Sequence, residues 1–514
     1  MATSECHDGL EALTKIANEP AIMDSRRAAA ILRYEDAPSS RARDTEQAVK
    51  IRSINPATEA VLATFESHSR EQMHAAVAEA QAAFETWRER TFDQRAGPMR
   101  ALAAVLRERA DRYARLITLE MGKPISESLA ELEKCARNCD FYAEHAQRFL
   151  ANETAETDAR ESFVAFEPLG LVLAVMPWNF PFWQVMRFAA PALMAGNGAI
   201  LKHASNVPQT ALAIEEAVRD AGFPAGLLRT VLVTGGDVEP LIADERIRAV
   251  TLTGSSETGS RIAELAGRAL KKAVLELGGS DPFIVLADAD LDGAVRTATK
   301  ARYLNAGQSC IAAKRFLVAE SVATEFEGRF ADAIAALRVG DPLDRATEVG
   351  PLARADLRDA LDQQVSESVA MGARVVVGGT RREGTGWFYE PTLLADVTDE
   401  MPVLRDETFG PVAALRRVRD ADEAIRVANS SRYGLGAAVW TRDTTAAKAI
   451  ARRLESGSVF VNGMVSSDPR LPFGGVKRSG YGRELGSFGI REFVNVQTVW
   501  VGPATEPIRN VSAE

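Results

Sequence analysis

The hydrophobic residues of this chain change their spacing near residue 163. Over residues 71–150 they recur every three or four positions, as at Leu102, Val105 and Leu106, which predicts amphipathic helices with one break near Gly122. Beyond residue 163, short apolar runs alternate with helical segments, and this rhythm predicts a parallel, doubly wound sheet covered on both faces. The predicted strands are residues 170–176, 199–202, 230–233, 249–253 and 273–277, and the predicted helices are 181–195, 209–221 and a segment from 256.

A second alternating region begins at Phe283 and continues to about residue 478. It follows the same rhythm, with an amphipathic segment at 290–304 and a β-like run at 316–319. The pattern therefore predicts a second α/β domain.

Three further segments lie outside these alternating regions. Residues 51–58 and 61–65 predict two short strands around a turn, and the β-branched run 493–500 predicts an edge strand. An edge strand of that length favours pairing with another subunit. Residues 1–48, with a short helical piece near 9–18, predict an extension outside the main core.

Composition narrows the class of protein. A chain of 514 residues is too long for one core, and its 46% hydrophobic and 26% charged content is typical of globular proteins. A net charge of −10 argues against nucleic acid or an anionic membrane as partner. Four cysteines are too few for a disulfide framework, and no signal-peptide or membrane-spanning pattern is found, so we expect a cytoplasmic protein.

One cysteine, Cys310, lies in a run of small residues, Asn-Ala-Gly-Gln-Ser-Cys-Ile-Ala-Ala (305–313). Small neighbours leave a thiol reachable, and the adjacent backbone N–H is placed to polarise a group that the sulfur attacks. The alternative is a buried cysteine that packs as a small hydrophobe. The loop alone leaves both interpretations open.

Two strand ends carry groups suited to an anionic ligand. Gly254 and Ser255 lie where a strand passes into a helix, and free N–H groups at a helix start favour a pyrophosphate. Lys202 and Ser205 follow another strand and suit an adenosine ribose or its 2′-phosphate. A glycine turn before a helix is common, and we expect His203 to be packed or exposed rather than catalytic.

Three polar residues suit acyl chemistry. Glu276 ends an apolar strand, where burial raises the pKa of a carboxyl and makes it a general base near neutral pH; the alternative is an exposed strand-end glutamate. Asn179 follows a strand and can donate to an oxyanion. Arg187 lies two turns into the next helix and leans back toward Asn179, unless it is a solvated charge.

Cys135, Cys139 and His145 share the helical region, but no second ligand cluster follows them. A packed helix face is expected there, and no metal site.

Together these stretches resemble the aldehyde dehydrogenase superfamily over residues 49–503. The motifs that carry the resemblance are Pro-Trp-Asn-Phe-Pro (177–181), Leu-Glu-Leu-Gly-Gly (275–279), Asn-Ala-Gly-Gln-Ser-Cys (305–310), Glu-Thr-Phe-Gly-Pro-Val (407–412) and Pro-Phe-Gly-Gly-Val-Lys-Arg-Ser-Gly (472–480). More narrowly, Leu-Lys-His-Ala-Ser-Asn (201–206) and Cys-Ile-Ala-Ala-Lys-Arg-Phe (310–316) resemble the bacterial NAD(P)-dependent succinate-semialdehyde dehydrogenases.

The resemblance implies a fold and a division into domains. The expected architecture is α/β, with a Rossmann-type doubly wound sheet, a second α/β catalytic domain and a small β oligomerisation element. The implied boundaries are 1–48 for the extension, 49–146 and 168–278 for the dinucleotide-binding domain, 279–478 for the catalytic domain, 147–167 and 479–503 for the oligomerisation element, and 504–514 for a C-terminal tail.

The resemblance also implies oxidation of a small aldehyde to a carboxylic acid. Cys310 attacks the aldehyde, the Asn179 amide and the Cys310 N–H hold the oxyanion, and Glu276 activates water. The positions that match cofactor contacts are Trp178, Lys202, Ser205, Gly254, Ser255, Leu277, Glu407 and Phe409.

Departures from the family pattern sharpen the prediction. Members that prefer NAD often carry glutamate at the position of Ser205, so we expect NADP to be preferred over NAD. Arg187 replaces a residue that is often aromatic in members that oxidise apolar aldehydes, and with Ser467 it suits a substrate with a terminal carboxylate, most simply succinic semialdehyde. Ala312 stands where some relatives carry a second cysteine, so no local disulfide switch is expected.

Other readings stay open from the sequence. A broad-specificity aldehyde dehydrogenase is the alternative for the substrate. A CoA-acylating relative usually lacks the base that Glu276 matches, and a thiol hydrolase would need a histidine in a catalytic context, which none of the five histidines has. Family habit implies a homodimer or homotetramer, with no nucleic acid or membrane partner.

Overall fold

The computed structural model of the protein describes residues 49–502. The predicted extension 1–48, with its short helix, and the predicted tail 504–514 therefore lie outside the described residues. None of the helices within the described part is long and apolar enough to cross a bilayer.

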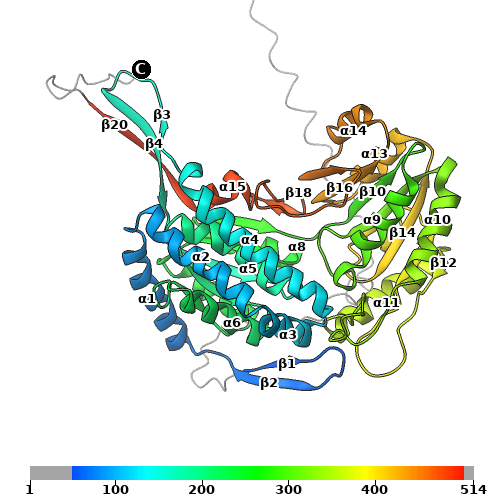
Figure 1. Cartoon of the computed structure of the whole chain (residues 1–514), viewed down its shortest axis with the longest axis horizontal. Coiled ribbons are helices and arrows are strands. Elements are labelled where there is room, and N and C mark those ends of the chain that lie inside the picture. Colours follow the sequence, from blue (N-terminus) through cyan, green and yellow to red (C-terminus); the bar gives the residue numbers. More distant parts are fainter. Residues whose placement is uncertain (1–48, 503–514) are drawn as a thin grey trace, which may run out of the picture. The chain divides into compact units, whose positions relative to one another are not determined.

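Six strands form the first sheet, in the order β19-β9-β8-β5-β6-β7. The strands from β5 to β9 are parallel, and β19 (Gly480–Tyr481) joins β9 antiparallel at one edge. Chain order reverses between β5 and β8, which is the point where doubly wound sheets bind ligands. The parallel strands are β5 (Leu171–Met176), β6 (Gly198–His203), β7 (Leu228–Thr230), β8 (Ile247–Thr253) and β9 (Lys272–Glu276). The predicted doubly wound sheet is confirmed (Figure 1).

Helices precede and connect these strands, as the three- and four-residue spacing predicts. The first four are α1 (Arg70–Trp87), α2 (Phe92–Glu108), α3 (Ala110–Met121) and α4 (Ile125–Phe149), and the connecting helices are α5 (Pro181–Met194), α6 (Pro208–Asp220), α7 (Val238–Ala243) and α8 (Ser256–Arg268). Leu102 and Leu106 of α2 are fully buried, and α4 packs between α2 and α5 (Figure 1). The predicted break is confirmed at Gly122, which ends α3 with a left-handed φ of 81°.

One predicted strand is shorter than the hydrophobic run suggested. Residues 230–233 were expected to be a strand, but β7 ends at Thr230. The Val231 N–H still donates to the Leu201 carbonyl (2.9 Å), but the chain then leaves the sheet. Thr234 starts a 3-10 turn, and its N–H and hydroxyl both donate to the Asp237 carboxylate, so local polar groups end the strand despite its apolar residues.

The second sheet has seven strands, in the order β12-β13-β14-β11-β10-β16-β17, and all but β12 run parallel. The strands are β10 (Asp281–Val285), β11 (Ala313–Ala319), β12 (Arg374–Val377), β13 (Thr392–Ala395), β14 (Val412–Val418), β16 (Gly436–Trp440) and β17 (Ser458–Val461). The helices between them are α9 (Leu291–Tyr303), α10 (Glu320–Ala335), α11 (Ala355–Ala370), α12 (Pro402–Arg405), α13 (Ala421–Asn429) and α14 (Thr444–Ala451). The second α/β region is therefore confirmed.

Small antiparallel sheets complete the described part. The predicted edge strand is β20 (Val494–Val501), which pairs along its whole length with β4 (Glu161–Pro168) at the edge of a three-stranded sheet (Figure 1). The remaining short elements are β1 (Lys50–Ile54), β2 (Val61–Glu66), β3 (Glu153–Thr154), β15 (Tyr433–Gly434), β18 (Val476–Lys477) and α15 (Gly486–Ile490).

The chain passes from the first sheet to the second through residues 277–280, between the end of β9 and the start of β10. On the other side of β9, β19 brings the late part of the chain back to the first sheet. Gly480 has a φ of 109°, and a Cβ atom there would collide with the Leu275 carbonyl oxygen.

Replacing Gly480 by alanine tests this crossing. We expect Gly480→Ala to lower the thermal unfolding midpoint by several degrees, because it strains the backbone and separates β19 from β9. Gly267→Ala is the matched control, since Gly267 lies on the exposed side of α8 with open space where a Cβ would go. Its midpoint should be unchanged or slightly higher. Equal midpoints for both variants would contradict the role given to Gly480.

Candidate active site

The loop that carries Cys310 begins with strained backbone. After α9, a 3-10 turn spans Leu304–Gly307, in which Asn305, Ala306 and Gly307 have φ values of 56°, 51° and 71°. Left-handed conformations cost free energy for Asn and more for Ala, so the surrounding structure must impose them. The loop then turns through Cys310 into β11.

Buried cations hold this loop in place. The Lys314 ammonium, with no exposed surface, donates to the carbonyl oxygens of Ser309 (2.9 Å) and Cys310 (2.7 Å). The Arg302 guanidinium is equally buried and donates to the carbonyls of Thr408 (3.2 Å) and Gly410. Arg302 also donates to the Gly307 carbonyl (3.4 Å), so it ties the cysteine loop to the loop before β14 and stabilises the strained conformation.

Cys310 is partly exposed, whereas Cys135 and Cys139 are buried. Burial of its sulfur raises the pKa of the Cys310 thiol to about 12, and the positive charges of Arg187 and Lys314 oppose that rise. The raised pKa favours the protonated thiol near neutral pH, even with these two charges nearby. Cys310, which the sequence predicted to be reachable, is therefore the partly exposed one of the three cysteines in residues 49–502.

The Asn179 amide lies against the same loop. Its Nδ2 donates to the Gln308 carbonyl (3.0 Å), and the Asn305 side chain in turn donates to the Asn179 carbonyl (2.8 Å). One of the two N–H bonds of the amide is used in this way, and no hydrogen bond within residues 49–502 uses the other. The end of β5 and the cysteine loop are therefore joined by reciprocal hydrogen bonds.

Glu276 ends β9 and is 2% exposed, and neither carboxylate oxygen has a hydrogen-bond partner among the described residues. Burial raises the pKa of its carboxyl well above the usual value, and the charge of nearby Glu484 raises it further, while Arg187 lowers it. The predicted burial of Glu276 is confirmed and the exposed alternative is excluded, but the surroundings include the charged side chains of Glu484 and Arg187 rather than apolar groups alone.

Arg187 is 2% exposed, so it is not a solvated helix charge. It forms an ion pair with the buried Glu484, lies over the Phe473 ring (4.5 Å to the centroid) and donates to the Thr253 hydroxyl (3.4 Å). Its charge lowers the pKa of both Glu276 and Cys310, which makes it a neighbour of both. Glu484 was not predicted from the sequence, because nothing in a single sequence indicates a carboxylate that returns to a site from so far along the chain.

The positions expected to contact a dinucleotide lie at the carboxyl ends of the first sheet. Lys202 is the penultimate residue of β6, and Ser205 is exposed two residues beyond that strand. Gly254 and Ser255 lie between β8 and α8, where the Ser255 hydroxyl accepts from the Thr258 N–H (3.2 Å) and caps the helix. These groups are on strands on either side of the switch point between β5 and β8.

The other expected cofactor positions lie near the crossing between the sheets. Trp178 makes an edge-to-face contact with Phe409 (5.7 Å between centroids), which brings the end of β5 to the loop before β14. The Glu407 carboxylate accepts from the Gly279 N–H (3.0 Å) and lies 3.3 Å from the Lys314 ammonium. Leu277 follows β9 directly, and its side chain is buried against Gly259 of α8.

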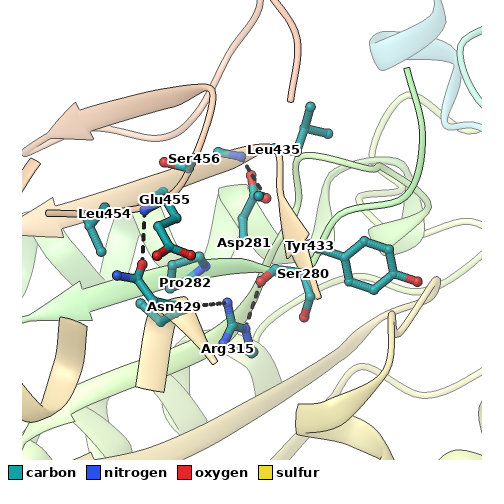
Figure 2. A pocket seen from close by; sticks show the side chains of 14 residues that line it. Ser280, Asp281, Pro282, Arg315, Asn429, Tyr433, Leu435, Leu454, Glu455 and Ser456 are labelled. Atoms are coloured by element: carbon teal, nitrogen blue, oxygen red, sulfur yellow. Dashed lines mark hydrogen bonds between the residues drawn. The ribbon is translucent and has the colours of Figure 1, made fainter. Parts of the chain in front are cut away.

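A small pocket lies beneath the crossing (Figure 2). The Arg315 guanidinium donates to three carbonyls, those of Ser280 (2.7 Å), Val427 (2.9 Å) and Ala428 (3.0 Å), and the Asp281 carboxylate accepts from the Gly436 N–H (3.0 Å). Burial raises the pKa of Asp281 to about 6, while Lys314 lowers it. The hydrogen bonds of Arg315 and Asp281 stabilise the starts of β10 and β11, and neither residue was expected from the sequence to have this role.

Ser467, expected to contact a substrate carboxylate, follows β17 and is buried. Its Oγ accepts a hydrogen bond from the Lys134 ammonium of α4 (2.7 Å). The structure therefore brings Lys134, which the sequence did not single out, to Ser467 from a helix whose sequence pattern suggested packing alone.

The remaining candidates are structural. Cys135 and Cys139 are buried on α4, and His145 stacks on Phe141 (4.4 Å between centroids), which confirms a packed helix face. His203 is packed as expected, with its Nε2 donating to the Pro181 carbonyl (3.0 Å). Residues 49–502 hold no group of His, Cys, Asp and Glu suited to a metal ion.

Comparison with known proteins gives a consistent result. A model of the aldehyde dehydrogenase family matches residues 43–499. The chain is 53% identical to a probable succinate-semialdehyde dehydrogenase [NADP(+)] of Synechocystis, over 88% of this chain and 99% of that protein. It is 49% identical to succinate-semialdehyde dehydrogenase [NADP(+)] 1 of Mycobacterium tuberculosis, with the same two coverages. The crystal structure of succinic semialdehyde dehydrogenase from Streptococcus pyogenes in complex with NADP+ superposes with a TM-score of 0.86 at 38% identity, over 88% of this chain and 100% of that one.

The raised pKa of Cys310 predicts how the thiol reacts. We expect its rate of alkylation by iodoacetamide, followed by peptide mass spectrometry, to rise about tenfold per pH unit from pH 7 to 9 with no plateau. The alkylation rate of a small free thiol such as N-acetylcysteine, measured alongside, should begin to level off as the pH passes the ordinary pKa of a cysteine thiol, about 8.5. A rate at Cys310 that is already constant from pH 7 would contradict the assignment, because it would mean a preformed thiolate.

Proposed function

Because the chain belongs to the aldehyde dehydrogenase family, we propose that it oxidises succinic semialdehyde to succinate with NADP as the preferred hydride acceptor. The observation that carries the proposal is the contact of the Cys310 loop with both the Asn179 amide and the glycine pair that closely follows the buried Glu276. The names of the relatives in Synechocystis and Mycobacterium tuberculosis support the choice of substrate and cofactor.

In the first stage, the Cys310 thiol loses its proton to solvent water, and the thiolate attacks the aldehyde carbon to form the thiohemiacetal adduct. The carbonyl oxygen becomes an oxyanion, and the free N–H of Asn179 and the backbone N–H of Cys310 are the proposed donors to it. Arg187 and Lys314 favour the thiolate because both charges lower the pKa of the thiol. The bonds from Lys314 to the loop carbonyls keep the sulfur in position during attack.

The second stage begins after the thiohemiacetal has been oxidised to a thioester. The Glu276 carboxylate takes a proton from water, and the water oxygen attacks the thioester carbon and releases the acid and the Cys310 thiol. Burial raises the pKa of Glu276, so its conjugate acid forms readily, and the charge of Arg187 preserves a population of the carboxylate. This buried base favours hydrolysis over transfer to a thiol such as CoA, the second candidate reaction. Addition of CoA to the assay distinguishes the two reactions by their products.

A dinucleotide fits the carboxyl edge of the first sheet. Lys202 is 9% exposed, and no carboxylate or carbonyl among the described residues is bonded to its ammonium, which leaves a buried cation ready for an anionic ligand. The N-terminus of α8 at Gly254 and Ser255 offers free N–H groups to a pyrophosphate. When bound, the nicotinamide supplies the hydride acceptor that converts the thiohemiacetal to a thioester.

The remaining cofactor roles follow from position. We assign Glu407 to the nicotinamide ribose and Trp178, Leu277 and Phe409 to the lining of the cofactor site, because these residues surround the crossing beside Cys310. Ser205 places no negative charge near Lys202, which suits a 2′-phosphate.

For the substrate, we assign Ser467 and Arg187 to the end of the site that receives the terminal carboxylate. Both are buried, and Arg187 neighbours the reactive cysteine. A broad-specificity enzyme would not need buried cations in this position, since they disfavour uncharged alkyl chains.

The domain boundaries and the assembly are also proposals. We keep residues 49–146 and 168–278 as the dinucleotide-binding domain, 279–478 as the catalytic domain, and 147–167 with 479–503 as the oligomerisation element. Val496 and Trp500 of β20 are 62% and 49% exposed at a sheet edge, which supports pairing with a second copy in a homodimer or homotetramer.

The direct test is production of NADPH from a panel of aldehydes with and without a terminal carboxylate. We expect kcat/KM for succinic semialdehyde to exceed that for butanal by at least about 100-fold, because one buried, charge-assisted carboxylate contact contributes on the order of 3 kcal/mol. Cys310→Ala is the control and should be inactive with every aldehyde. Similar values for succinic semialdehyde and butanal would instead support the broad-specificity alternative.

Cofactor preference is tested at Ser205. We expect Ser205→Glu to lower kcat/KM for NADP by at least about tenfold relative to NAD, because the carboxylate repels a 2′-phosphate a few ångströms away. Ser205→Ala is the matched control for loss of the hydroxyl and should retain the NADP preference. An unchanged NADP/NAD ratio in Ser205→Glu would place the 2′-phosphate elsewhere.

A further inference from the structure

Lys134 is a partly buried cation that the proposed mechanism does not use. It lies on α4 and is partly buried, with its ammonium 2.7 Å from Ser467 Oγ and 4.2 Å from the centroid of the Trp183 ring. Trp183 belongs to α5 and is 3% exposed, so the lysine stem and head lie between two helices and the loop after β17. The Asn138 side chain, one turn further along α4, donates to the Met186 carbonyl (2.9 Å) and fixes α4 against α5.

The charge of Lys134 is not compensated. Among the residues that the structure describes, no carboxylate is within ion-pair distance of its ammonium. The carboxylates of Glu131 and Asp468 raise the pKa of Lys134, but each forms its ion pair with another residue. Glu131 pairs with Lys123 and accepts from the N–H groups of Phe182 and Trp183 (both 2.9 Å).

Asp468 is similarly committed, since it forms a bidentate pair with Arg470. An uncompensated ammonium in a partly buried position costs free energy, and proteins retain such a group where a ligand supplies the missing anion. The Trp183 face offsets part of that cost but does not neutralise the charge.

The charge of Arg187, by contrast, is already balanced by Glu484. A substrate carboxylate that relied on Arg187 alone would compete with a buried carboxylate for one guanidinium. Lys134 adds a whole positive charge to the same region, because it lies over the ring of Trp183, which is one turn before Arg187 on α5. The charge of Arg187 accordingly lowers the pKa of Lys134. The two cations therefore lie near each other beside α5.

We propose that Lys134 and Ser467 together bind the terminal carboxylate of the aldehyde substrate, with Lys134 supplying the charge that decides specificity. Ser467 accepts from Lys134 with its oxygen, which leaves its own hydrogen and two N–H bonds of the ammonium to donate to the two carboxylate oxygens. The inference rests on the proposed oxidation of a carboxylate-bearing aldehyde and adds a residue that the sequence did not single out.

Lys134→Met tests the charge while preserving the length and the contact with Trp183. We expect the ratio of kcat/KM for succinic semialdehyde to that for butanal to fall by about 10- to 100-fold, with the loss mainly in KM. Lys448→Met, which removes an exposed lysine of α14, is the matched control and should leave the ratio unchanged. Equal losses for both aldehydes in Lys134→Met would show a structural role and overturn the proposal.

The pH dependence is a second, independent test. Burial and the charge of Arg187 lower the pKa of Lys134 to about 8, opposed by the charges of Cys135, Glu131 and Asp468. Lys134 is charged below that pH, so the wild-type specificity ratio should be constant below pH 8 and fall above it. Lys134→Arg keeps its charge at all these pH values, and its ratio should stay constant to pH 9.5. A wild-type ratio that does not fall above pH 8, or an equal fall in Lys134→Arg, would overturn the proposal.

Binding of succinate, measured by calorimetry on the full chain, separates this inference from the proposed function. We expect Lys134→Met to bind succinate at least about tenfold more weakly than the wild type. If the wild type produces no NADPH from succinic semialdehyde, the proposed function fails whatever the lysine does. If the wild type is active and the variant retains both its specificity ratio and its succinate affinity, the inference alone fails.

Discussion

The site depends on how closely the backbone passes from the first sheet to the second. Between β9 and β10 the chain meets the cysteine loop so tightly that a Cβ at Gly279 would collide with the Cys310 carbonyl oxygen. A Cβ at Gly278 would likewise collide with the Glu407 carboxylate. Side chains would separate these parts, so two consecutive glycines permit the strand that ends in Glu276 to lead directly to the loop that carries Cys310, where we propose a base and a nucleophile.

The second constraint is electrostatic. Lys314 and Arg302 are buried with backbone carbonyls as partners, so they hold the strained loop before Cys310 in place. Arg187 forms an ion pair with Glu484 and lowers the pKa of both Glu276 and Cys310, which couples the acid–base properties of these two groups to one ion pair. Removing one member of such a buried pair leaves an uncompensated charge, so changes at these positions should alter several pKa values at once.

The sequence predicted the parts of the fold that local patterns govern. The strands from β5 to β9 and the helices between them follow from alternating apolar runs, and the edge position of β20 follows from its β-branched composition. The prediction was wrong at residues 231–233, where the polar contacts of Thr234 and Asp237 end the strand. Similarly, the position of Glu276 at a strand end was predicted, because an apolar run ending in a glutamate is visible without any partner.

By itself, therefore, the sequence determined the α/β class, the family, and which cysteine, carboxyl and amide are candidates for the chemistry, because motifs and periodicity are local properties of the chain. Only the tertiary structure decided which charges are balanced. It paired Arg187 with Glu484 and brought Lys134 to Ser467 from a helix more than 300 positions earlier in the chain. Such pairings depend on contacts between residues far apart in sequence, and no local pattern specifies them.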